Sequence, residues 1–312
     1  MARTRPVAGY GPSMDEATAR SLGRAADVVA RRADDTAAAE RLGLGLSRLR
    51  TVPGGLAYQR YTPSLSVVLA GRKRSVVGDD DQVWGLDRFF ITPVDLPVLS
   101  GVVATDERYG FLSARWRLDP ALVTEVATAM PRTRREPSGP LDRLGSWTPA
   151  LADVFARLLG LLDEPEHIPL LGPQFARETV LRLLQTTQAP RVLAATDAHD
   201  PVVPRAVRLL TERIAEPWTL DALAAEVSAS RATLSRRFKQ ATSMTPMQYL
   251  KRLRLGEARH RMVVRGDSAA RAATAVGYRS APHFTRDYRL VYGASPAADA
   301  ARAREQLREW AG

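Results

Sequence analysis

The sequence predicts an α+β protein in two parts: an antiparallel β-barrel with flanking helices, followed by an all-α domain with two helix-turn-helix units. Three observations predict this fold class. Short runs of β-branched and aromatic residues, broken by Gly, Pro and Asp, occur between about residue 43 and residue 119. The last third of the 312-residue chain carries almost all of its excess positive charge. The same third contains an internal repeat with an offset of 50 residues.

Residues 1–42 are expected to form a tail and a helical lead-in. Residues 14–42 are rich in Ala and Arg, which favour helix. No apolar run follows the basic start of the chain, so we expect no secretory signal. No run approaches the roughly 18 apolar residues of a membrane span, and we expect a cytoplasmic protein that does not bind membranes. The chain contains no Cys, which excludes disulfides and Cys-ligated metals.

Residues 43–130 are expected to form the β-rich domain. The predicted strands are Leu65–Ala70, Arg74–Val77, Arg88–Thr92, Val98–Val103 and Gly110–Leu118. Short strands at this spacing, separated by turns that contain Gly and Asp, predict an antiparallel sandwich or a small barrel.

The aromatic residues of this region have two interpretations. Each of them fits an ordinary barrel core, but as a group they could line a cavity, because a small barrel can enclose one ligand. The candidate ligand-binding residues are Trp84, Phe89, Tyr109, Arg115 and Trp116. Arg115 and Arg117 alternate with apolar neighbours, so either one of them points into the cavity, where it could hold an anion, or both lie on a solvated outer face.

Residues 131–204 are expected to form a linker and a helical connector. Residues 131–140 are charged and rich in Pro, which predicts a break between domains. Beyond this break, apolar residues between Leu151 and Leu162 recur at helical spacing. The stripe fits either a homodimer interface or packing against the chain's own barrel, and both alternatives stay open.

The positive charge is concentrated in the last third of the chain. Residues 201–312 contain 20 Arg or Lys and 10 Asp or Glu, a net charge of +10. The first 200 residues contain the other 25 basic and 24 acidic residues, a net charge of +1. A basic domain attached to a neutral one indicates that the basic domain binds a polyanion. General enrichment in Arg is the alternative explanation, since 42 of the 45 basic residues are Arg.

The internal repeat pairs the string LSRRFK at residues 234–239 with FTRDYR at residues 284–289. Each string follows a Ser, at positions 230 and 280, and Ser is a favoured helix N-cap. In a helix from about residue 231 to 241, Leu234 and Phe238 share an inward face. The opposite face then presents small, hydroxylic and basic side chains: Ala232, Ser235, Arg236 and Lys239. A helix with one core face and one basic face is what entry into a DNA major groove requires.

A helix is predicted between the two copies of the repeat. Thr245 suits its N-cap and Pro246 its first position, and the helix should run to about Val264. Nineteen residues make a rod of roughly 28 Å. One turn of B-DNA is about 34 Å, so such a rod can hold two recognition helices in successive major grooves.

Residues 205–304 resemble the DNA-binding domain of the AraC/XylS family of bacterial regulators. The motifs that carry the resemblance are Leu223-Ala224, the 234–239 string, Met244-Thr245-Pro246, Glu257-Ala258-Arg259, Val276-Gly277-Tyr278, His283-Phe284-Thr285-Arg286 and Ser295-Pro296. The sequence departs from the family pattern at Ser228 and Ser243, where relatives usually have Gly at a turn with positive φ. Residues 305–312 lie beyond the resemblance and are expected to be a tail.

The resemblance implies a function and the residues that carry it. A regulator of this family binds double-stranded promoter DNA and works with RNA polymerase. Base contacts are implied for outward residues of the two recognition helices: Ala232, Ser235, Arg236, Thr285 and Arg286. Contacts to phosphate or to the groove edge are expected from the neighbouring polar side chains: Arg231, Lys239, Arg279, His283 and Arg289.

Residues 60–125 resemble the cupin-like sensing domain that precedes this DNA-binding module in one AraC subgroup. The matching strings are PSL at 63–65, VVLAGRKR at 67–74, PVDLP at 93–97 and LDPALV at 118–123. The resemblance implies a cupin-like barrel that senses a small-molecule effector whose identity the sequence does not give.

The rival interpretation is a cupin-type enzyme, or a small-molecule-binding protein with an incidental basic C-terminal domain. Cupin enzymes often hold a metal on His and carboxylate side chains. The four His residues of this chain, at 167, 199, 260 and 283, all lie outside the predicted strands. No catalytic constellation can be argued from spacing, so we expect no metal, no cofactor and no enzyme.

Overall fold

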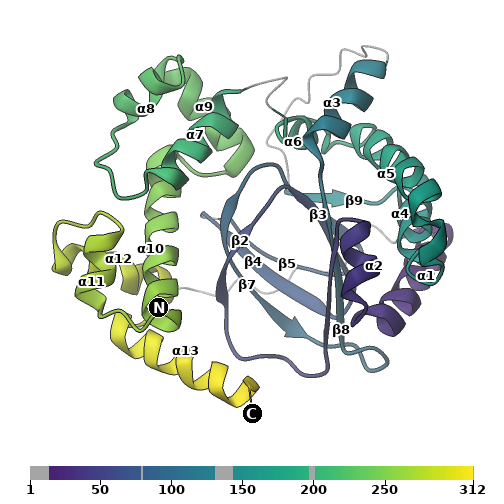
Figure 1. The fold of residues 1–312 in the computed structure, drawn as a ribbon, viewed down its shortest axis with the longest axis horizontal. Coiled ribbons are helices and arrows are strands. Elements are labelled where there is room, and N and C mark those ends of the chain that lie inside the picture. Colours follow the sequence, from purple (N-terminus) through teal and green to yellow (C-terminus); the bar gives the residue numbers. More distant parts are fainter. Residues whose placement is uncertain (1–13, 79, 131–142, 197–200, 312) are drawn as a thin grey trace.

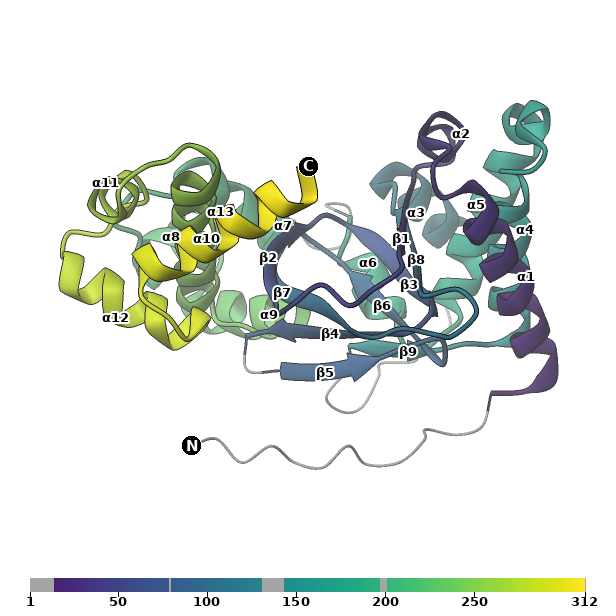
Figure 2. The same cartoon turned by 90° about the horizontal axis from the view of Figure 1, so that it is seen from below.

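The computed structural model describes residues 14–78, 80–130, 143–196 and 201–311. These residues form an N-terminal β-barrel with a layer of helices on one side and an all-helical C-terminal domain on the other (Figures 1 and 2). The α+β fold class expected from the sequence is confirmed. None of the described helices is both long enough and apolar enough to cross a membrane.

Two antiparallel sheets form the barrel. The larger sheet has the spatial order β1 (Leu44–Leu49), β8 (Phe111–Arg117), β3 (Ser64–Ala70), β6 (Arg88–Thr92) and β9 (Leu144–Ser146). The smaller sheet has the order β2 (Ala57–Tyr61), β7 (Leu96–Ala104), β4 (Arg72–Val77) and β5 (Asp80–Trp84). The five predicted strands are all present with slightly shifted bounds. Strands β1, β2, β5 and β9 were not predicted.

Both faces of the larger sheet are covered. Successive side chains of a strand point to opposite faces. In β8, Leu112 and Trp116 therefore pack under the helices, whereas Phe111 is buried on the opposite face and exposed Arg115 lines an open cavity there. In β3 every residue from Ser64 to Ala70 is buried. The helices are thus part of the N-terminal core, because one face of the larger sheet is buried by packing against them.

The helical layer is built mainly from three helices: α1 (Glu16–Arg32), α4 (Pro149–Gly160) and α5 (Ile168–Leu184). The shorter helices α2 (Thr36–Arg41), α3 (Pro120–Ala129) and α6 (Ala189–Leu193) complete it. The apolar stripe that starts at Leu151 is buried within the chain, and Val154 and Phe155 have no exposed surface. Of the two interpretations of this stripe, the structure supports packing against the chain's own barrel.

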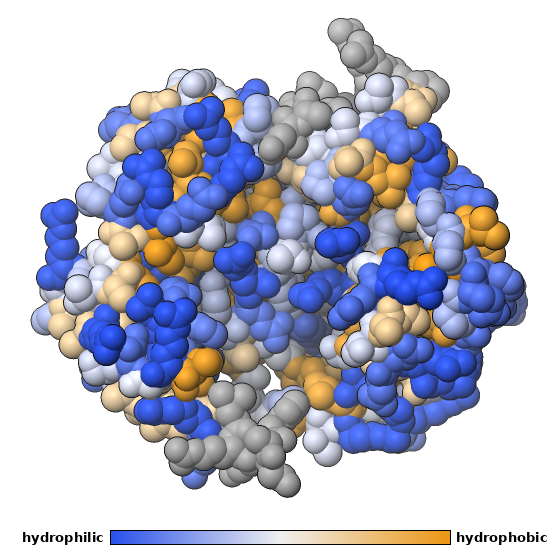
Figure 3. Space-filling view, viewed as in Figure 1, coloured by the Kyte–Doolittle hydropathy of each residue, from blue (hydrophilic) through white to orange (hydrophobic). Residues whose placement is uncertain are grey.

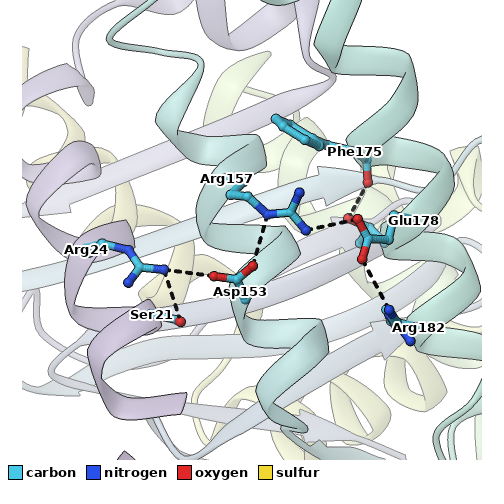
Figure 4. Close-up of polar contacts among 8 residues, drawn as sticks. Ser21, Arg24, Asp153, Arg157, Phe175, Glu178 and Arg182 are labelled. Carbon is cyan, nitrogen blue, oxygen red and sulfur yellow. Dashed lines mark hydrogen bonds and ion pairs between the residues drawn. The ribbon is translucent and has the colours of Figure 1, made fainter. Parts of the chain in front are cut away.

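A ladder of ion pairs crosses the polar side of α1, α4 and α5 (Figure 4). Asp153 of α4 accepts hydrogen bonds from Arg24 of α1 at 2.9 Å and from Arg157 at 3.0 Å. Arg157 also donates to Glu178 of α5 at 2.9 Å. These side chains are substantially exposed, so each pair contributes roughly 0–1 kcal/mol. The layer is therefore held mainly by its apolar side.

The N-terminal domain extends beyond the boundary predicted at residue 130. Strand β9 pairs with β6, and α4 and α5 pack on the same sheet, so residues up to Val192 pack in the core of this domain. The Pro-rich break predicted at 131–140 lies outside the described residues. Helix α6 lies within residues 131–204, which were predicted to form a linker and a helical connector.

The C-terminal domain contains two helix-turn-helix units joined by a long helix. Its helices are α7 (Val202–Glu212), α8 (Leu220–Glu226), α9 (Arg231–Thr242), α10 (Pro246–Val264), α11 (Ala269–Ala275), α12 (Ala281–Tyr292) and α13 (Pro296–Ala311). Helices α8 and α9 form the first unit, and α11 and α12 form the second. The tail predicted at 305–312 is instead the end of α13, which continues to Ala311.

The two units bury their apolar residues in different hydrophobic clusters. The buried residues of the first unit, among them Phe238 and Met244, belong to the same cluster as barrel residues such as Val77 and Phe90. The second unit has a separate cluster centred on Phe284 and Tyr288. The barrel and the first unit are thus one packing unit, and the second unit is another.

Large apolar side chains on the surface are scattered. The exposed ones are Val52, Val83, Val103, Leu170, Val264 and Leu290. On the face shown in Figure 3, hydrophilic residues dominate both lobes and the apolar areas are small and separate. Scattered residues of this kind do not by themselves mark an interface.

Candidate nucleic-acid interface

The first recognition helix, α9, is held by an N-cap and by an aromatic contact. Ser230 accepts a hydrogen bond from the amide of Thr233 at 3.1 Å, which is the N-cap predicted from the sequence. Leu234 and Phe238 are fully buried, and the Phe238 ring meets Tyr249 of α10 edge to face at 5.4 Å between centroids. The inward face predicted for this helix is therefore the one observed, and the opposite face lies outward.

The outward face of α9 carries the predicted DNA-contact residues. Ala232, Arg236 and Lys239 are exposed and Ser235 is half-buried. Within the described part of the chain, Arg236 and Lys239 form no ion pair. Arg231 differs from them, because its Nε lies 3.1 Å from Oδ1 of Asp221 in α8. Two cations of this helix are thus free to meet an anion, and a third is loosely paired.

The second recognition helix, α12, repeats this construction. Gly277 in the preceding turn has φ +88°, and a Cβ there would lie 2.4 Å from the carbonyl oxygen of Ala215, so the turn requires Gly. Ser280 caps the helix by accepting from the amide of His283 at 3.4 Å. Phe284 and Tyr288 are buried on the inward face.

The outward face of α12 presents the remaining predicted contacts. Arg279, Arg286 and Arg289 are exposed and make no ion pair among the described residues, and Thr285 is half-buried. An open hollow on this face is lined by Ala281, Pro282, Thr285, Arg286, Arg289 and Leu290. Leu290 was not predicted; its side chain is 75% exposed beside Arg286, and an apolar group there can meet a thymine methyl.

Two buried carboxylates stabilise the second unit. Asp287 of α12 accepts from Lys251 of α10 at 2.8 Å and lies 3.3 Å from Nε2 of His283. Asp299 of α13 accepts from Arg259 at 2.7 Å and from the Tyr288 hydroxyl at 2.8 Å. Burial alone would raise the pKa of Asp299, but the hydrogen bond and charge of Arg259 outweigh it and lower that pKa. His283 is therefore tied to the core of α12 as well as exposed on its flank.

Helix α10 separates the two units along its length (Figure 1). It begins with a capping box, in which Thr245 accepts from the amide of Gln248 at 3.2 Å and the Gln248 side chain accepts from the amide of Thr245 at 2.9 Å. The cap at Thr245, Pro246 in the first turn and the end at Val264 are all as predicted.

Two buried arginines fasten the N-terminal domain to the C-terminal end of α9. Arg143 donates to the carbonyl of Thr242 at 2.7 Å and pairs with Asp80 of β5 at 2.7 Å. Arg191 donates to the carbonyl of Ala241 at 3.3 Å. Burial lowers the pKa of Arg143 to about 10, and the nearby charge of Arg191 adds to this. Helix-end carbonyls attract cations, so these contacts hold the first recognition helix on the barrel.

The candidate ligand-binding residues do not all come together. Trp84 and Arg115 line a cavity of about 270 Å³ in the barrel. Phe89 and Trp116 are on the other face of the larger sheet, under the helices, where the Trp116 indole donates to the carbonyl of Leu42 at 3.1 Å. Tyr109 lies outside the cavity and donates to Asp27 of α1. The grouping of these five residues is corrected to Trp84 and Arg115, because neighbours along a strand point to opposite faces.

Sequence reasoning missed other residues of this cavity. Gln59 of β2, Lys73 of β4 and Ser113 of β8 also line it. The signal for Ser113 was available, because it is two residues from Arg115 and therefore on the same face. Lys73 and Gln59 could not be placed, since nothing in the sequence showed that β2 and β4 lie across the cavity from the strand that carries Arg115. Among the described residues, no group of three or more His, Cys, Asp or Glu could hold a metal ion.

Comparison with known proteins covers both domains. The family described as AraC-type transcriptional regulator N-terminus matches residues 43–191, and a helix-turn-helix domain family matches residues 223–302. The HTH-type transcriptional regulator ArgR of Pseudomonas aeruginosa is 32% identical over 148 residues, 47% of this chain and 45% of ArgR. The HTH-type transcriptional activator RhaS of Escherichia fergusonii is 32% identical over 116 residues, 37% of this chain and 42% of RhaS. The chain spans about half the length of these curated relatives.

A solved structure has the same overall fold. ToxT from Vibrio cholerae aligns with 82% of this chain and 97% of its own, with a TM-score of 0.50 and 10% sequence identity. At this identity the likeness concerns the fold alone. The family matches fall on the barrel domain and on the two helix-turn-helix units respectively. The chain thus combines a domain similar to the N-terminus of AraC-type transcriptional regulators with a helix-turn-helix domain, the two domains that its sequence motifs predicted.

Proposed function

We propose that the protein binds promoter DNA through α9 and α12 and adjusts transcription in response to a small molecule held in its barrel. The observation that carries this proposal is the pair of recognition helices separated by α10, each with unpaired cations on its outward face. The proposed setting is the bacterial cytoplasm, with RNA polymerase as the partner that the family implies.

In the proposed complex the two recognition helices enter successive major grooves. Helix α10 has 19 residues and is roughly 28 Å long, close to the 34 Å or so of one DNA turn. The side chains assigned to base edges are Ala232, Ser235, Arg236, Thr285 and Arg286. Arg236 and Arg286 can each place two donors on the O6 and N7 atoms of a guanine.

The phosphate contacts are assigned to the cations around these helices. Lys239, Arg279 and Arg289 are exposed and are assigned to phosphates, whereas exposed His283, whose Nε2 lies 3.3 Å from Asp287, is assigned a contact to the groove edge. Arg231 has to exchange Asp221 for a phosphate, so it contributes less than the others. A homodimer is compatible with this proposal but needs a surface other than the buried stripe of α4.

The test is selection of bound sequences from a randomised duplex library by the full chain. We expect enrichment of a motif with two elements about 10 base pairs apart, one for each recognition helix. Two copies of the whole motif in the selected sequences would indicate a dimer. The double variant Arg236→Ala, Arg286→Ala is the control and should enrich no motif. Binding without any shared motif in the wild-type selection would overturn the proposal.

A further inference from the structure

The barrel cavity is open to solvent at its rim, where Ser47, Gln59 and Arg115 are exposed, and the charged groups that line it are of one sign. Residues of both sheets line it, among them Ser47, Ser66, Ser113 and Arg115 of the larger sheet and Lys73 and Trp84 of the smaller sheet. Two of these lining residues are cations, and none is an Asp or a Glu. A ligand in this cavity would therefore meet positive charge and hydroxyl groups but no carboxylate.

The two cations lie on opposite sheets and face the same space. Lys73 extends from β4, with Nζ 5.2 Å from the centroid of the Tyr61 ring. Arg115 extends from β8, and its guanidinium lies over Gly45 of the paired strand β1: an added Cβ at Gly45 would be 3.6 Å from Nη2. Within the part of the chain that the structure describes, neither cation pairs with an acid.

Two arginines that follow cavity-lining residues point away from the cavity and pair with acids. Arg74 follows Lys73 in β4 and points to the other face, where it forms a two-pronged ion pair with Asp81. Arg60 follows Gln59 in β2 and pairs with Asp95 at 3.2 Å. Charges of one sign gathered in a concave site attract a ligand of the opposite sign.

The rest of the wall suits the body of a small organic molecule. The Trp84 ring stacks on Phe90 at 6.0 Å between centroids, and its indole donates to Ser75 at 3.1 Å, so its orientation is fixed. The volume of about 270 Å³ lies below the roughly 300–1,000 Å³ of drug-sized pockets. The cavity also opens at a sheet, without the helix N-terminus that commonly holds phosphate.

We propose that this cavity binds a small organic carboxylate, with its carboxylate between Lys73 and Arg115 and its apolar body against Trp84 and Tyr61. Arg115 can meet a carboxylate with two parallel hydrogen bonds, and Lys73 adds a second charge-assisted bond. Ser47, Ser66 and Ser113 remain for further polar groups of the ligand. This inference rests on the proposed function only in naming the effector class, since ligand binding can be measured without DNA.

The test compares acids with their neutral analogues on the full chain. Thermal unfolding is followed with benzoate, succinate and hexanoate at millimolar concentration, and with benzamide, succinamide and hexanamide as partners of the same shape. Inorganic phosphate is a further arm. We expect at least one acid to raise Tm, because a ligand that binds only the folded state stabilises it, and its amide to have no effect. The inference is overturned if no acid raises Tm, or if amides or phosphate raise it equally.

Variants then locate the site. Lys73→Gln and Arg115→Gln should each weaken binding of the stabilising acid about tenfold or more, since each removes a charge-assisted hydrogen bond. Arg117→Gln is the matched control, because Arg117 is exposed on the same strand but does not line the cavity. Gly45→Val should also block binding, by filling space beside Arg115 without changing charge. Equal affinity in Arg115→Gln and Arg117→Gln would overturn the assignment.

Failure of this inference is distinguishable from failure of the proposed function. Without ligand, Lys73→Gln and Arg115→Gln should select the same DNA motif as the wild type, since both residues lie in the barrel. DNA selection that succeeds while no acid binds refutes the effector class alone. Acid binding that obeys the variants while no DNA motif is selected refutes the proposed function and leaves the carboxylate site standing.

Discussion

Gly256 lies in α10 at a position where a residue of the barrel domain packs against the helix. It lies inside a helix, where Gly is about 1 kcal/mol less favourable than Ala. A Cβ at this position would be 2.0 Å from Cζ of Tyr58 in β2, so the Tyr58 ring occupies the space that a side chain would need. Gly256 therefore makes α10 intrinsically less stable, but it allows Tyr58 of the barrel to pack against the helix.

The first prediction follows from this contact. Gly256→Ala should lower Tm despite the better helix propensity of Ala, because the Tyr58 ring must move away from α10. Gly23→Ala in α1 is the matched control: nothing lies within 4 Å of its added Cβ, and it should raise stability by about 0.5–1 kcal/mol. Thermal unfolding of both variants measures the difference. A Gly256→Ala protein as stable as Gly23→Ala would show that the Tyr58 contact is not maintained in solution.

The second prediction concerns the two outward arginines of the recognition helices. Arg236→Ala and Arg286→Ala should each cost roughly 1–3 kcal/mol on the selected DNA site and little on random DNA. The affected base pairs should lie about 10 apart. Competition binding against a randomised operator measures both quantities. Arg41→Ala, an exposed arginine of α2 in the distant helical layer, should change neither. Equal loss on specific and random DNA would mean that these arginines contact only phosphates.

At the scale of elements, α9 is bracketed by two strained turns. Ser228 before the helix and Ser243 after it have φ of 54° and 56°, a region that favours Gly. These are the two turn positions at which the resemblance to the AraC/XylS family predicts Gly. The second recognition helix has Gly277 and Gly293 at the equivalent places. The first unit therefore carries strain that the second does not.

The third prediction tests this strain. Ser228→Gly and Ser243→Gly should each raise the free energy of unfolding by about 0.5–1 kcal/mol, because Gly adopts positive φ without a Cβ clash. Ser230→Gly is the control: its φ is −71° and its side chain is the N-cap, so the change should lower stability by a few tenths of a kcal/mol. Chemical denaturation measures all three. If Ser243→Gly behaves like Ser230→Gly, the turn is not strained.

Elements of the helical domain could be predicted from the sequence because their signals are local. Caps such as Ser230 and Thr245 and the spacing of Leu234 and Phe238 lie within one or two turns of the helix they define. The barrel was harder. Strand β9 has three residues and exists only through its pairing with β6, more than 50 residues away, which no local pattern encodes.

The prediction of the ligand-binding residues was wrong in part for a different reason. When helices cover the outside of a sheet, both faces of its strands are buried, as in β3, so alternation does not reveal which face is the interior. Phe89 and Phe90 are neighbours and both are buried, yet they belong to different cores. Of the five predicted ligand-binding residues, only Trp84 and Arg115 line the cavity.

At the scale of the molecule, the charge of the C-terminal domain should set the salt dependence of DNA binding. With about eight phosphate contacts, the logarithm of the binding constant should fall with the logarithm of salt concentration at a slope near −7. Lys239→Ala should reduce the magnitude of that slope by about 0.9, whereas Arg41→Ala should leave it unchanged. Titration of the full chain with random duplex at several salt concentrations measures it. A slope near zero would remove the claim of DNA binding.

The shared core of the barrel and the first unit also bears on how the chain can be divided. Phe238, Met244 and Tyr249 pack in the barrel's cluster, and the Tyr249 hydroxyl donates to the carbonyl of Asp95 at 2.7 Å. From Leu255 onward, buried residues belong to the second unit. The cooperative boundary therefore lies within α10, and native-state hydrogen exchange should show the second unit opening while the first stays protected with the barrel. A chimaera that borrows only the second helix-turn-helix unit of another regulator should be joined inside α10 after Leu253. A junction before α7 would instead place the barrel against the first helix-turn-helix unit of the other regulator, which does not share this barrel's packing residues.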